Sequence, residues 1–368
     1  MSSSLPDNQH FAERLGEWVQ TDGPDHDVVV SCRTRLARNL DGYPFVSKLT
    51  SDRASELAER VHALLREHCL DGGTVWVSIA EAPVVLRLLL RERHLASRDL
   101  APSDGRREVE PGRAVAFGRS ETVSVMVNEE DHLRLQGLAS GFDLDGAWRR
   151  VRDLDLELEG SVQYAHSERL GYLTGCPTNV GTGLRASVML HLPALGMVKR
   201  ELEKVFNAAQ RTGLAVRGMS GEGSRAAGDF YQISNQVTLG RTEQQLIDDL
   251  KALVPSIVDY ERRVRRVLLD DQRSSLEDRI SRSCGMLRTA RALPTEVALQ
   301  HLSNVRLGVC LGLQNGVQLA DLGAYAIQIQ KGHIQALSRT SPSAELLPVD
   351  ERDRLRATFL RQHFAQAK

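Results

Sequence analysis

The stretch that most constrains this chain is residues 175–191, with the sequence GCPTNVGTGLRASVMLH. A cysteine enters a Pro-Thr-Asn turn, and a Gly-x-Gly pair then precedes Arg185 and an apolar run. Glycines let backbone N–H groups approach an anion, and an arginine adds a permanent positive charge at the same place. The stretch therefore predicts an anion-binding loop that leads into a buried strand or helix. The alternative is a loop whose glycines serve only the backbone, with Arg185 solvated.

Residues 181–186 also fit the dinucleotide-binding pattern G-x-G-x-x-A. That pattern requires a buried strand directly before the first glycine. The Cys-Pro-Thr-Asn segment in that position is typical of a turn, so we reject a dinucleotide-binding fold.

Composition narrows the class of protein. The 368 residues suffice for one large domain or two modest ones, and a net charge of −1 creates no global field for nucleic acid or membrane. The N-terminus lacks a signal-peptide pattern, and no apolar run is long enough to span a bilayer, so we expect a cytoplasmic protein. The five cysteines lie far apart and the histidines lack ligand spacing, so no disulfide framework or dedicated metal site is expected.

Apolar periodicity and turn residues predict the elements. Helices are expected over residues 51–70, with Ser51 as N-cap, and over 81–94, 143–158, 192–213 and 350–364. Strands are expected over residues 28–30, 74–79, 114–117, 122–127, 214–217 and 229–238. Long helices predominate over residues 242–313, with Pro255 near a helix start or kink and Pro294 at a break. This shift predicts a core domain over residues 1–260 and a helical domain over residues 261–368.

Arg33 and Arg35 follow a short β-branched run. In a strand they project to the same face, where two guanidinium groups repel unless an anion lies between them. The alternative is a solvated sheet edge.

Residues 128–134, NEEDHLR, place three acids in a row after an expected strand. Such carboxylates need cations to neutralise them. They either hold and deprotonate a cationic substrate, with Arg134 close to an anion, or form the acidic N-terminus of a helix, which the helix dipole favours.

Residues 217–224, RGMSGEGS, form a glycine-rich loop with one arginine and one glutamate. Such a loop is suited to closing over a substrate, because glycines absorb backbone change. The alternative is an ordinary hairpin loop.

Together these motifs contain five arginines and several glutamates. Clustered cations suit a triphosphate, and paired carboxylates suit a guanidinium. A charged guanidinium is a poor nucleophile, so a base must take its proton as the P–N bond forms. The combination indicates phosphoryl transfer, which depends mainly on positioning and charge stabilisation.

SCRTRLARN, NEEDHLRLQ, CPTNVGTGLRASV and RGMSGEGS, in this order, resemble the motifs of the ATP:guanidino phosphotransferases, the phosphagen kinases. The chain is most similar to their bacterial branch, the protein arginine kinases. The first motif begins at residue 31, so we expect this chain to lack the N-terminal helical domain of animal phosphagen kinases. LEDRISRSCGML and NVRLGVCLGL also resemble the bacterial branch, as does RDRLRA at residues 352–357.

The resemblance implies an α+β fold, with a large antiparallel β-sheet flanked by helices and a C-terminal helical domain for dimerisation and phosphoarginine binding. It implies transfer of the ATP γ-phosphate to arginine side chains of proteins, with Mg²⁺ held mainly by phosphates and water. The implied ATP-binding residues are Ser31, Cys32, Arg33, Thr34, Arg35, His94, Arg134, Arg185, Ala186, Ser187, Val188, Met189, Arg217, Gly218, Met219, Ser220 and Gly221.

The resemblance also implies catalytic roles. Glu130 and Glu222 would clamp the target guanidinium, one of them acting as base, with Glu129 in support. Cys176 would lie against the guanidinium as a thiolate; the alternative is a small buried residue. For His94, the resemblance implies a place near the nucleotide, and the alternative is a cation at the end of a helix.

The RDRLRA motif implies a second site, formed by Arg352, Asp353, Arg356 and Ala357. Arg352 and Arg356 are four residues apart and share a helix face, so both could hold one phosphate while Asp353 takes the guanidinium of phosphoarginine. Phosphoarginine would then be an allosteric ligand. The alternative is a solvated charged helix.

Heat-shock repressors and Clp-type protease components are the implied partners, because phosphoarginine marks proteins for degradation in this branch. Two other functions remain open: a kinase of free arginine or another small guanidino compound, and a non-catalytic adaptor that binds nucleotide or phosphoarginine. The missing N-terminal domain argues against the first, and the intact glutamates, cysteine and arginines argue against the second. The chain departs from the family at Cys32, usually serine, which would place an oxidisable thiol beside the phosphates. Met219-Ser220 stands where we expect Leu/Ile-Tyr.

Overall fold

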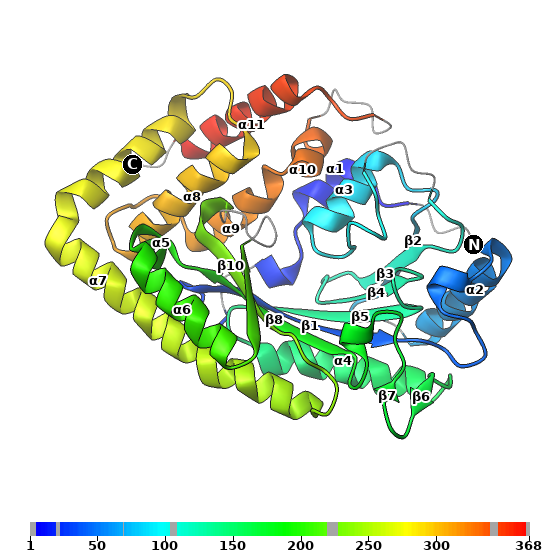
Figure 1. Cartoon of the computed structure of the whole chain (residues 1–368). Helices are drawn as coiled ribbons and strands as arrows, with labels where there is room; N and C mark the ends of the chain where they lie inside the picture. Colours follow the sequence, from blue (N-terminus) through cyan, green and yellow to red (C-terminus); the bar gives the residue numbers. More distant parts are fainter. Residues whose placement is uncertain are drawn as a thin grey trace.

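An eight-stranded antiparallel sheet forms the centre of the molecule, in the strand order β2-β3-β4-β5-β1-β8-β10-β9 (Figure 1). The computed structural model describes residues 5–19, 23–68, 70–103, 109–218, 227–338 and 345–365. The strands of this sheet are β1 Val29–Arg38, β2 Thr74–Ser78, β3 Ala114–Gly118, β4 Val123–Val127, β5 Leu133–Ser140, β8 Leu184–His191, β9 Leu214–Gly218 and β10 Phe230–Asn235. A separate short hairpin contains β6 His166–Ser167 and β7 Gly171–Tyr172.

One face of the sheet is covered by helices. Leu36 of β1 packs in one apolar core with residues of α2, α4, α6 and the first half of α7. The bounds of these helices are α2 Ser51–Glu67, α4 Leu144–Glu159, α6 Lys199–Arg211 and α7 Glu243–Thr289. Each presents an apolar stripe at helical spacing, which is buried against alternate strand residues.

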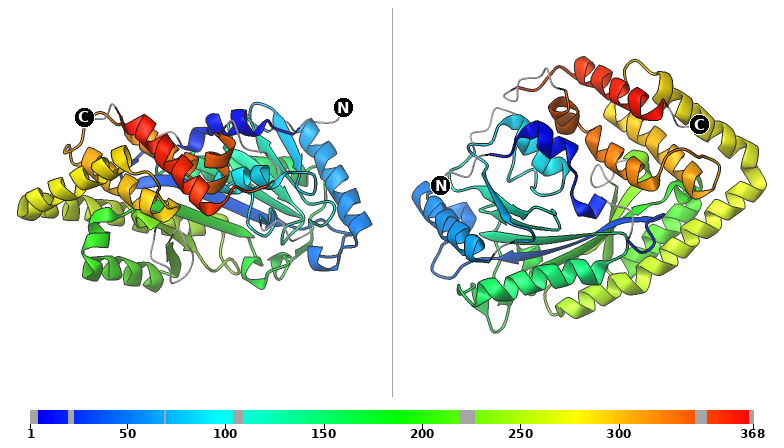
Figure 2. Two further views of the ribbon diagram at one scale, coloured as in Figure 1. Left: turned by 90° about the horizontal axis from the view of Figure 1, so that it is seen from above. Right: turned by 180° about the vertical axis from the view of Figure 1, so that it is seen from behind.

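The other face is covered at its two ends and carries the site between them. The short helix α3 Val84–Glu92 packs on β2, β3 and β4, and α1 Asn8–Glu13 packs on α3. Figures 1 and 2 show α3 and the C-terminal helices on the side of the sheet opposite α4. The C-terminal helices are α8 Thr295–Cys310, α9 Leu319–Gln328, α10 Lys331–Ala336 and α11 Val349–Phe364.

The C-terminal helices have their own core, which includes Ile280 and Leu287 from the second half of α7. Helix α7 therefore belongs to both cores. Its one non-helical residue is Gln272, with φ −136° and ψ 31°, whereas Pro255 lies inside the helix. The limit that we expected at residue 260 falls within this helix, ahead of the irregular turn.

Most expected elements are present, with corrections at their ends. The predicted N-cap Ser51 is wrong: Thr50 is the cap, and its hydroxyl accepts from the Arg53 N–H. The helix expected over 81–94 spans only Val84–Glu92, because Pro83 is its N-cap. The segment 192–213 forms two helices, α5 Pro193–Met197 and α6, which are separated at Val198.

Short 3₁₀ turns complete the described chain, at η1 Glu17–Val19, η2 Val46–Lys48, η3 Pro177–Asn179 and η4 Ala227–Asp229. None of the described helices is long and apolar enough to cross a bilayer.

Candidate functional site

The pairing register brings five arginines to one face of the sheet, which we call the arginine face. Arg35 of β1 is directly opposite Arg185 of β8, and Ala37 of β1 is opposite Arg134 of β5. Cross-strand partners point to the same side, and so do residues two apart along a strand. Arg33, Arg35, Arg134 and Arg185 therefore share a side. The register continues through Met189 and Gln232 to Arg217.

The arginine face is crowded with positive charge. Burial and the fields of Arg185 and Arg134 lower the pKa of Arg33 to about 10. Burial, Arg33, Arg134 and Arg185 hold the pKa of Arg35 well below its ordinary value. A bound polyanion would relieve this repulsion. The face thus has the charge and the geometry to hold a polyphosphate.

Alternate residues of the same strands point into the opposite core. Cys32 is fully buried there, and Thr34 donates its hydroxyl hydrogen to the Ala147 carbonyl of α4. Ala186 and Val188 belong to the same core. The expectation that Cys32 places a thiol beside the phosphates is therefore wrong, because strand alternation turns it away. These four residues can meet a ligand on the arginine face only through their backbone.

The three acids of residues 128–134 form a turn between β4 and β5, so the helix alternative is wrong. Glu129 is buried and accepts from Ser97 Oγ at 2.6 Å, while Arg134 Nη1 lies 2.6 Å from its other oxygen. Glu130 pairs with Arg134 Nη2 at 2.8 Å, and its side chain is 45% exposed. Glu129 thus braces Arg134, whereas Glu130 reaches solvent at the edge of the arginine face.

Asp131 is a residue that the sequence analysis missed. Its Oδ1 accepts from Gly175 N at 2.6 Å and from Asn39 Nδ2 at 2.7 Å, so it joins the glutamate turn to the loop that carries Cys176. A Cβ at Gly175 would lie 2.7 Å from the Glu130 carbonyl oxygen, so only glycine permits this approach. No local pattern links positions 39, 131 and 175, although a buried carboxylate always needs such partners.

Cys176 lies next to this junction and is partly exposed, with Sγ 3.0 Å from Thr178 Oγ1. Downstream, Gly181 and Gly183 have φ values of 111° and 67°, and Cβ atoms there would lie 2.6 Å from backbone oxygens of Thr238 and Ala37. The backbone therefore requires glycine at both positions, while Arg185 belongs to the arginine face.

Arg38 also holds the loop that leads from Cys176 to Arg185. Its guanidinium pairs with Asp155 at 2.7 Å, donates to the Thr182 carbonyl at 2.9 Å and lies over the Tyr172 ring at 3.5 Å from the centroid. All of these contacts are structural, so Arg38, although it lies within the first motif, is not part of the arginine face.

His94 follows α3 in the left-handed region, with φ 60°, and its ring packs on Trp18. Burial, followed by the fields of Arg33 and Arg35, lowers its pKa to about 3. His94 is therefore neutral at physiological pH, and its alternative role as a helix-terminal cation is wrong.

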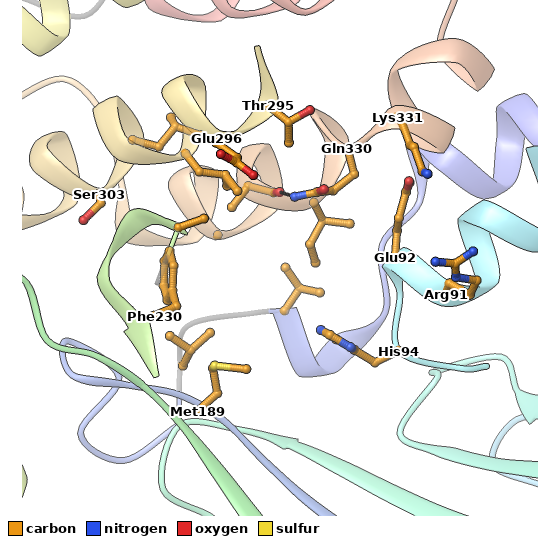
Figure 3. Close-up of a pocket in the computed structure, with 18 of the residues that line it drawn as sticks. Arg91, Glu92, His94, Met189, Phe230, Thr295, Glu296, Ser303, Gln330 and Lys331 are labelled. Atoms are coloured by element: carbon orange, nitrogen blue, oxygen red, sulfur yellow. Dashed lines mark hydrogen bonds between the residues drawn. The ribbon is translucent and has the colours of Figure 1, made fainter. Parts of the chain in front are cut away.

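A cavity of about 980 Å³ extends from the arginine face to the C-terminal helices. Ser31, Arg33, His94 and Met189 line it on the sheet side. Figure 3 shows Met189, Phe230 and His94 around one part of this space, with Gln330 and Lys331 from the C-terminal region across from His94.

The RDRLRA motif lies on α11 and also borders this cavity through Arg352, Asp353 and Arg356. Arg356 is buried, pairs with Asp353 at 2.6 Å and donates to the carbonyls of Ile329 and Leu293. Ala357 is buried in the core of the C-terminal helices. The alternative of a solvated charged helix is thus wrong at Arg356 and Ala357. The candidates Met219, Ser220, Gly221 and Glu222 lie outside the described residues.

Comparison with known proteins decides the family. The family model "ATP:guanido phosphotransferase, C-terminal catalytic domain" matches residues 59–264, and the "Protein-arginine kinase McsB C-terminal domain" matches residues 273–368. The chain belongs to the ATP:guanido phosphotransferase family. A protein-arginine kinase of Halothermothrix orenii is 41% identical over 355 residues, with 95% of this chain and 96% of that protein covered.

A second relative, the protein-arginine kinase of Halalkalibacterium halodurans, is 42% identical over 353 residues, with 95% of this chain and 96% of that protein covered. The second family model also covers the C-terminal helices, since it matches residues 273–368. This member of the family is therefore an ATP-dependent arginine phosphotransferase, in the protein-arginine kinase branch.

Solved structures of phosphagen kinases share the fold. Lombricine kinase is 26% identical with a TM-score of 0.56, covering 71% of this chain and 72% of that chain. The duplicated taurocyamine kinase from Schistosoma mansoni is 24% identical with a TM-score of 0.58, covering 78% of this chain and 40% of that chain.

Among the described residues, no group of three or more histidine, cysteine, aspartate or glutamate side chains is placed to hold a metal ion.

Proposed function

We propose that this kinase binds MgATP with its phosphates on the arginine face and transfers the γ-phosphoryl group to an arginine side chain of a protein. The observation that carries the proposal is the register that aligns five arginines beside the glutamate turn. Removal of one such donor is expected to lower the rate by about 10²–10³, by analogy with an oxyanion-hole donor.

The exposed Glu130 is suited to hold the target guanidinium, and Glu222 is its proposed second clamp. One of the two carboxylates takes a guanidinium proton while that nitrogen attacks the γ-phosphorus and the bond to the β,γ-bridging oxygen breaks. ADP leaves, and phosphoarginine remains. Glu129 supports the reaction indirectly, since it fixes Arg134 through an ion pair at 2.6 Å.

The proposed place of the nucleotide base is toward Met189 and His94. A neutral imidazole that packs on Trp18 suits a base better than a phosphate. Cys176, beside Gly175 and the glutamate turn, is proposed to contact the bound guanidinium. Mg²⁺, when bound with the nucleotide, would offset charge on the transferred group, with the arginine face holding the phosphates.

The finer features of the family are also proposals for this chain: a homodimer formed by the C-terminal domain, cytoplasmic location, no direct contact with nucleic acid, and protein targets that include heat-shock repressors and Clp-type protease components. Phosphoarginine is proposed to bind near Arg352 as an allosteric ligand. We propose that the domain limit lies near Gln272, between the two matched ranges.

A paired assay tests this function. The purified chain is incubated with MgATP and either free L-arginine or an unfolded, arginine-containing protein, and acid-labile phosphate is measured on each. Labelling of the protein alone is expected, and E130Q should lose it while still binding ATP. Labelling of free arginine alone would instead make the chain a short phosphagen kinase. Silence in both, with ATP bound, would favour the adaptor.

A further inference from the structure

One end of the sheet carries both the glutamate turn and the segment that follows β10. β1 pairs antiparallel with β5 and with β8, and β10 also pairs antiparallel with β8. The beginnings of β5 and β8 and the end of β10 therefore lie along the same edge of the sheet. Figures 1 and 2 show the β6–β7 hairpin and the beginning of α7 at this edge of the molecule. Residues 236–240 are thus close to the loop that leads into β8.

The segment after β10 buries one side chain and exposes its two neighbours. Thr238 is buried, and its hydroxyl lies 3.0 Å from the Thr178 carbonyl oxygen. Thr178 Oγ1 in turn lies 3.0 Å from Cys176 Sγ. Val237 and Leu239 are 58% and 49% exposed. Thr238 therefore fixes two exposed apolar side chains beside the loop that carries Cys176.

The turn of the β6–β7 hairpin adds a third apolar side chain, Leu170, which is also exposed. A Cβ at Gly171 would lie 2.6 Å from the Gly181 carbonyl oxygen, and a Cβ at Gly181 would lie 2.8 Å from Leu239 Cα. The two glycines thus let the three backbone segments pack side by side. We call Leu170, Val237 and Leu239 the apolar rim.

The apolar rim belongs to an uncharged part of the chain. Residues 170–184 and 236–240 contain no Asp, Glu, Lys, Arg or His, although 26% of the whole chain is charged. Such a surface offers no counter-charge to a phosphate, in contrast to the neighbouring arginine face. Apolar side chains that are exposed together mark a site of interaction, and they gain free energy when another apolar side chain covers them.

We propose that the apolar rim binds an apolar side chain of the substrate protein, close in sequence to the target arginine. The inference rests on the proposed place of the guanidinium beside Glu130 and Cys176, because the rim is continuous with that place. It assigns a binding surface to the part of a protein substrate that free arginine lacks. In an extended polypeptide, the side chains two and four residues from the arginine point to the same side as the arginine itself. These are the side chains that can contact the rim while the guanidinium is bound.

Steady-state kinetics with a disordered carrier protein that contains a single arginine test the proposal. One version of the carrier has serine at the second and fourth positions on each side of the arginine, and the other version has leucine there. The wild type should phosphorylate the leucine version with a kcat/KM about tenfold higher, because part of a leucine side chain becomes buried. In V237S/L239S the two versions should be equal, and the value for the serine version should match that of the wild type.

Two further variants serve as controls. V237I/L239M keeps the rim apolar and should keep the preference for the leucine version. V267S replaces an apolar side chain that is 56% exposed on α7, and it should keep the preference as well. The KM for ATP should be the same in all of these variants.

The outcomes separate this inference from the proposed function. If the wild type phosphorylates both versions equally, the rim has no part in substrate binding and the proposed function stands. If it phosphorylates neither version, the proposed function and the inference both fail. An equal loss for both versions in V237S/L239S would mean that these side chains only support the loop that carries Cys176, which overturns the inference. A changed sedimentation coefficient of V237S/L239S would assign the rim to contact between copies of the chain and overturn it too.

Discussion

The acids between β4 and β5 differ sharply in their surroundings. Glu129 and Asp131 are buried at 5% and 0% exposure and are each held by two or more partners, whereas Glu130 reaches solvent. A buried, fully engaged carboxylate is suited to fix its neighbours, and an accessible one is suited to meet a substrate. Glu129 and Asp131 therefore fix the local structure, whereas Glu130 is the acid of this turn that can contact a substrate.

Asp131→Ala should separate these roles. It removes the acceptor of the Gly175 and Asn39 hydrogen bonds, so the loop that carries Cys176 loses its link to Glu130. We expect kcat with a protein substrate to fall about tenfold to a hundredfold while the KM for ATP is kept, because such hydrogen bonds contribute about 1.5–3 kcal/mol. Steady-state kinetics measure both constants. D131N retains one acceptor oxygen and should be less affected; a rise in the KM for ATP alone would contradict this role.

His94 predicts a pH dependence of stability. Its pKa is about 3 in the folded protein and near 6.5 in the unfolded chain, so the unfolded chain binds the proton first as the pH falls. The contribution of a neutral His94 is complete above pH 6.5 and is lost as the pH falls toward 3, with a slope of at most about 1.4 kcal/mol per pH unit.

The nucleotide-free protein and H94N are compared by urea unfolding between pH 7 and pH 5. The variant should lose less free energy of unfolding over this interval than the wild type. Equal losses would show that His94 is protonated in the folded state.

At the level of elements, the C-terminal helices are joined to the catalytic domain where a carboxylate of α3 meets the first turn of α10. Glu92, at the end of α3, accepts backbone hydrogens from Gly332 and His333 of α10. A Cβ at Gly332 would lie 2.6 Å from Leu88 Cβ, so glycine is needed for this close packing. The contact fixes α10 on α3.

Glu92→Ala should loosen that junction. The loss of a charged acceptor leaves two buried N–H groups without a partner, which costs about 1–3 kcal/mol. Hydrogen exchange of the Gly332 and His333 amides should accelerate, and the midpoint of thermal unfolding should fall. Glu81, exposed before α3, provides the control E81A. Unchanged exchange at both amides would refute the junction.

The elements also show what local sequence can predict. Strands β2 and β4 follow from runs rich in β-branched residues, because such residues fit a pleated sheet surface. The acidic turn could not be predicted from local sequence, because acids suit a turn and a helix start equally well. In the structure Asn128 adopts φ 54°, which is incompatible with the helix alternative. The arginine face follows from alternation in β1, but its full extent depends on registers between strands far apart in the chain. Asp131, Asn39 and Ser97 act through such distant contacts, so no spacing pattern could reveal them.

Over the whole molecule, a net charge of −1 conceals a strongly positive interior face. Five arginines are gathered on the arginine face, and Glu129 and Glu130 pair with Arg134 at its edge. A protein that holds like charges together loses stability there and regains it when an anion binds. The arginine face is therefore expected to lower the stability of the nucleotide-free protein while it provides the binding site for the phosphates.

Arg33→Met tests this expectation, because the variant should be more stable than the wild type without nucleotide and less stable with MgATP. Arg33 stays protonated at pH 7, since its pKa is about 10, and it faces the fields of Arg185 and Arg134. Removal of its charge should raise the midpoint of thermal unfolding without nucleotide. With MgATP the order should reverse: at one hundred times Kd a ligand stabilises the wild type by about 2.7 kcal/mol, and the variant should lose most of this gain. R152M, on the exposed side of α4, should alter neither. A variant that is destabilised without nucleotide and still gains stability from MgATP would mean that Arg33 contributes to packing rather than to phosphate binding.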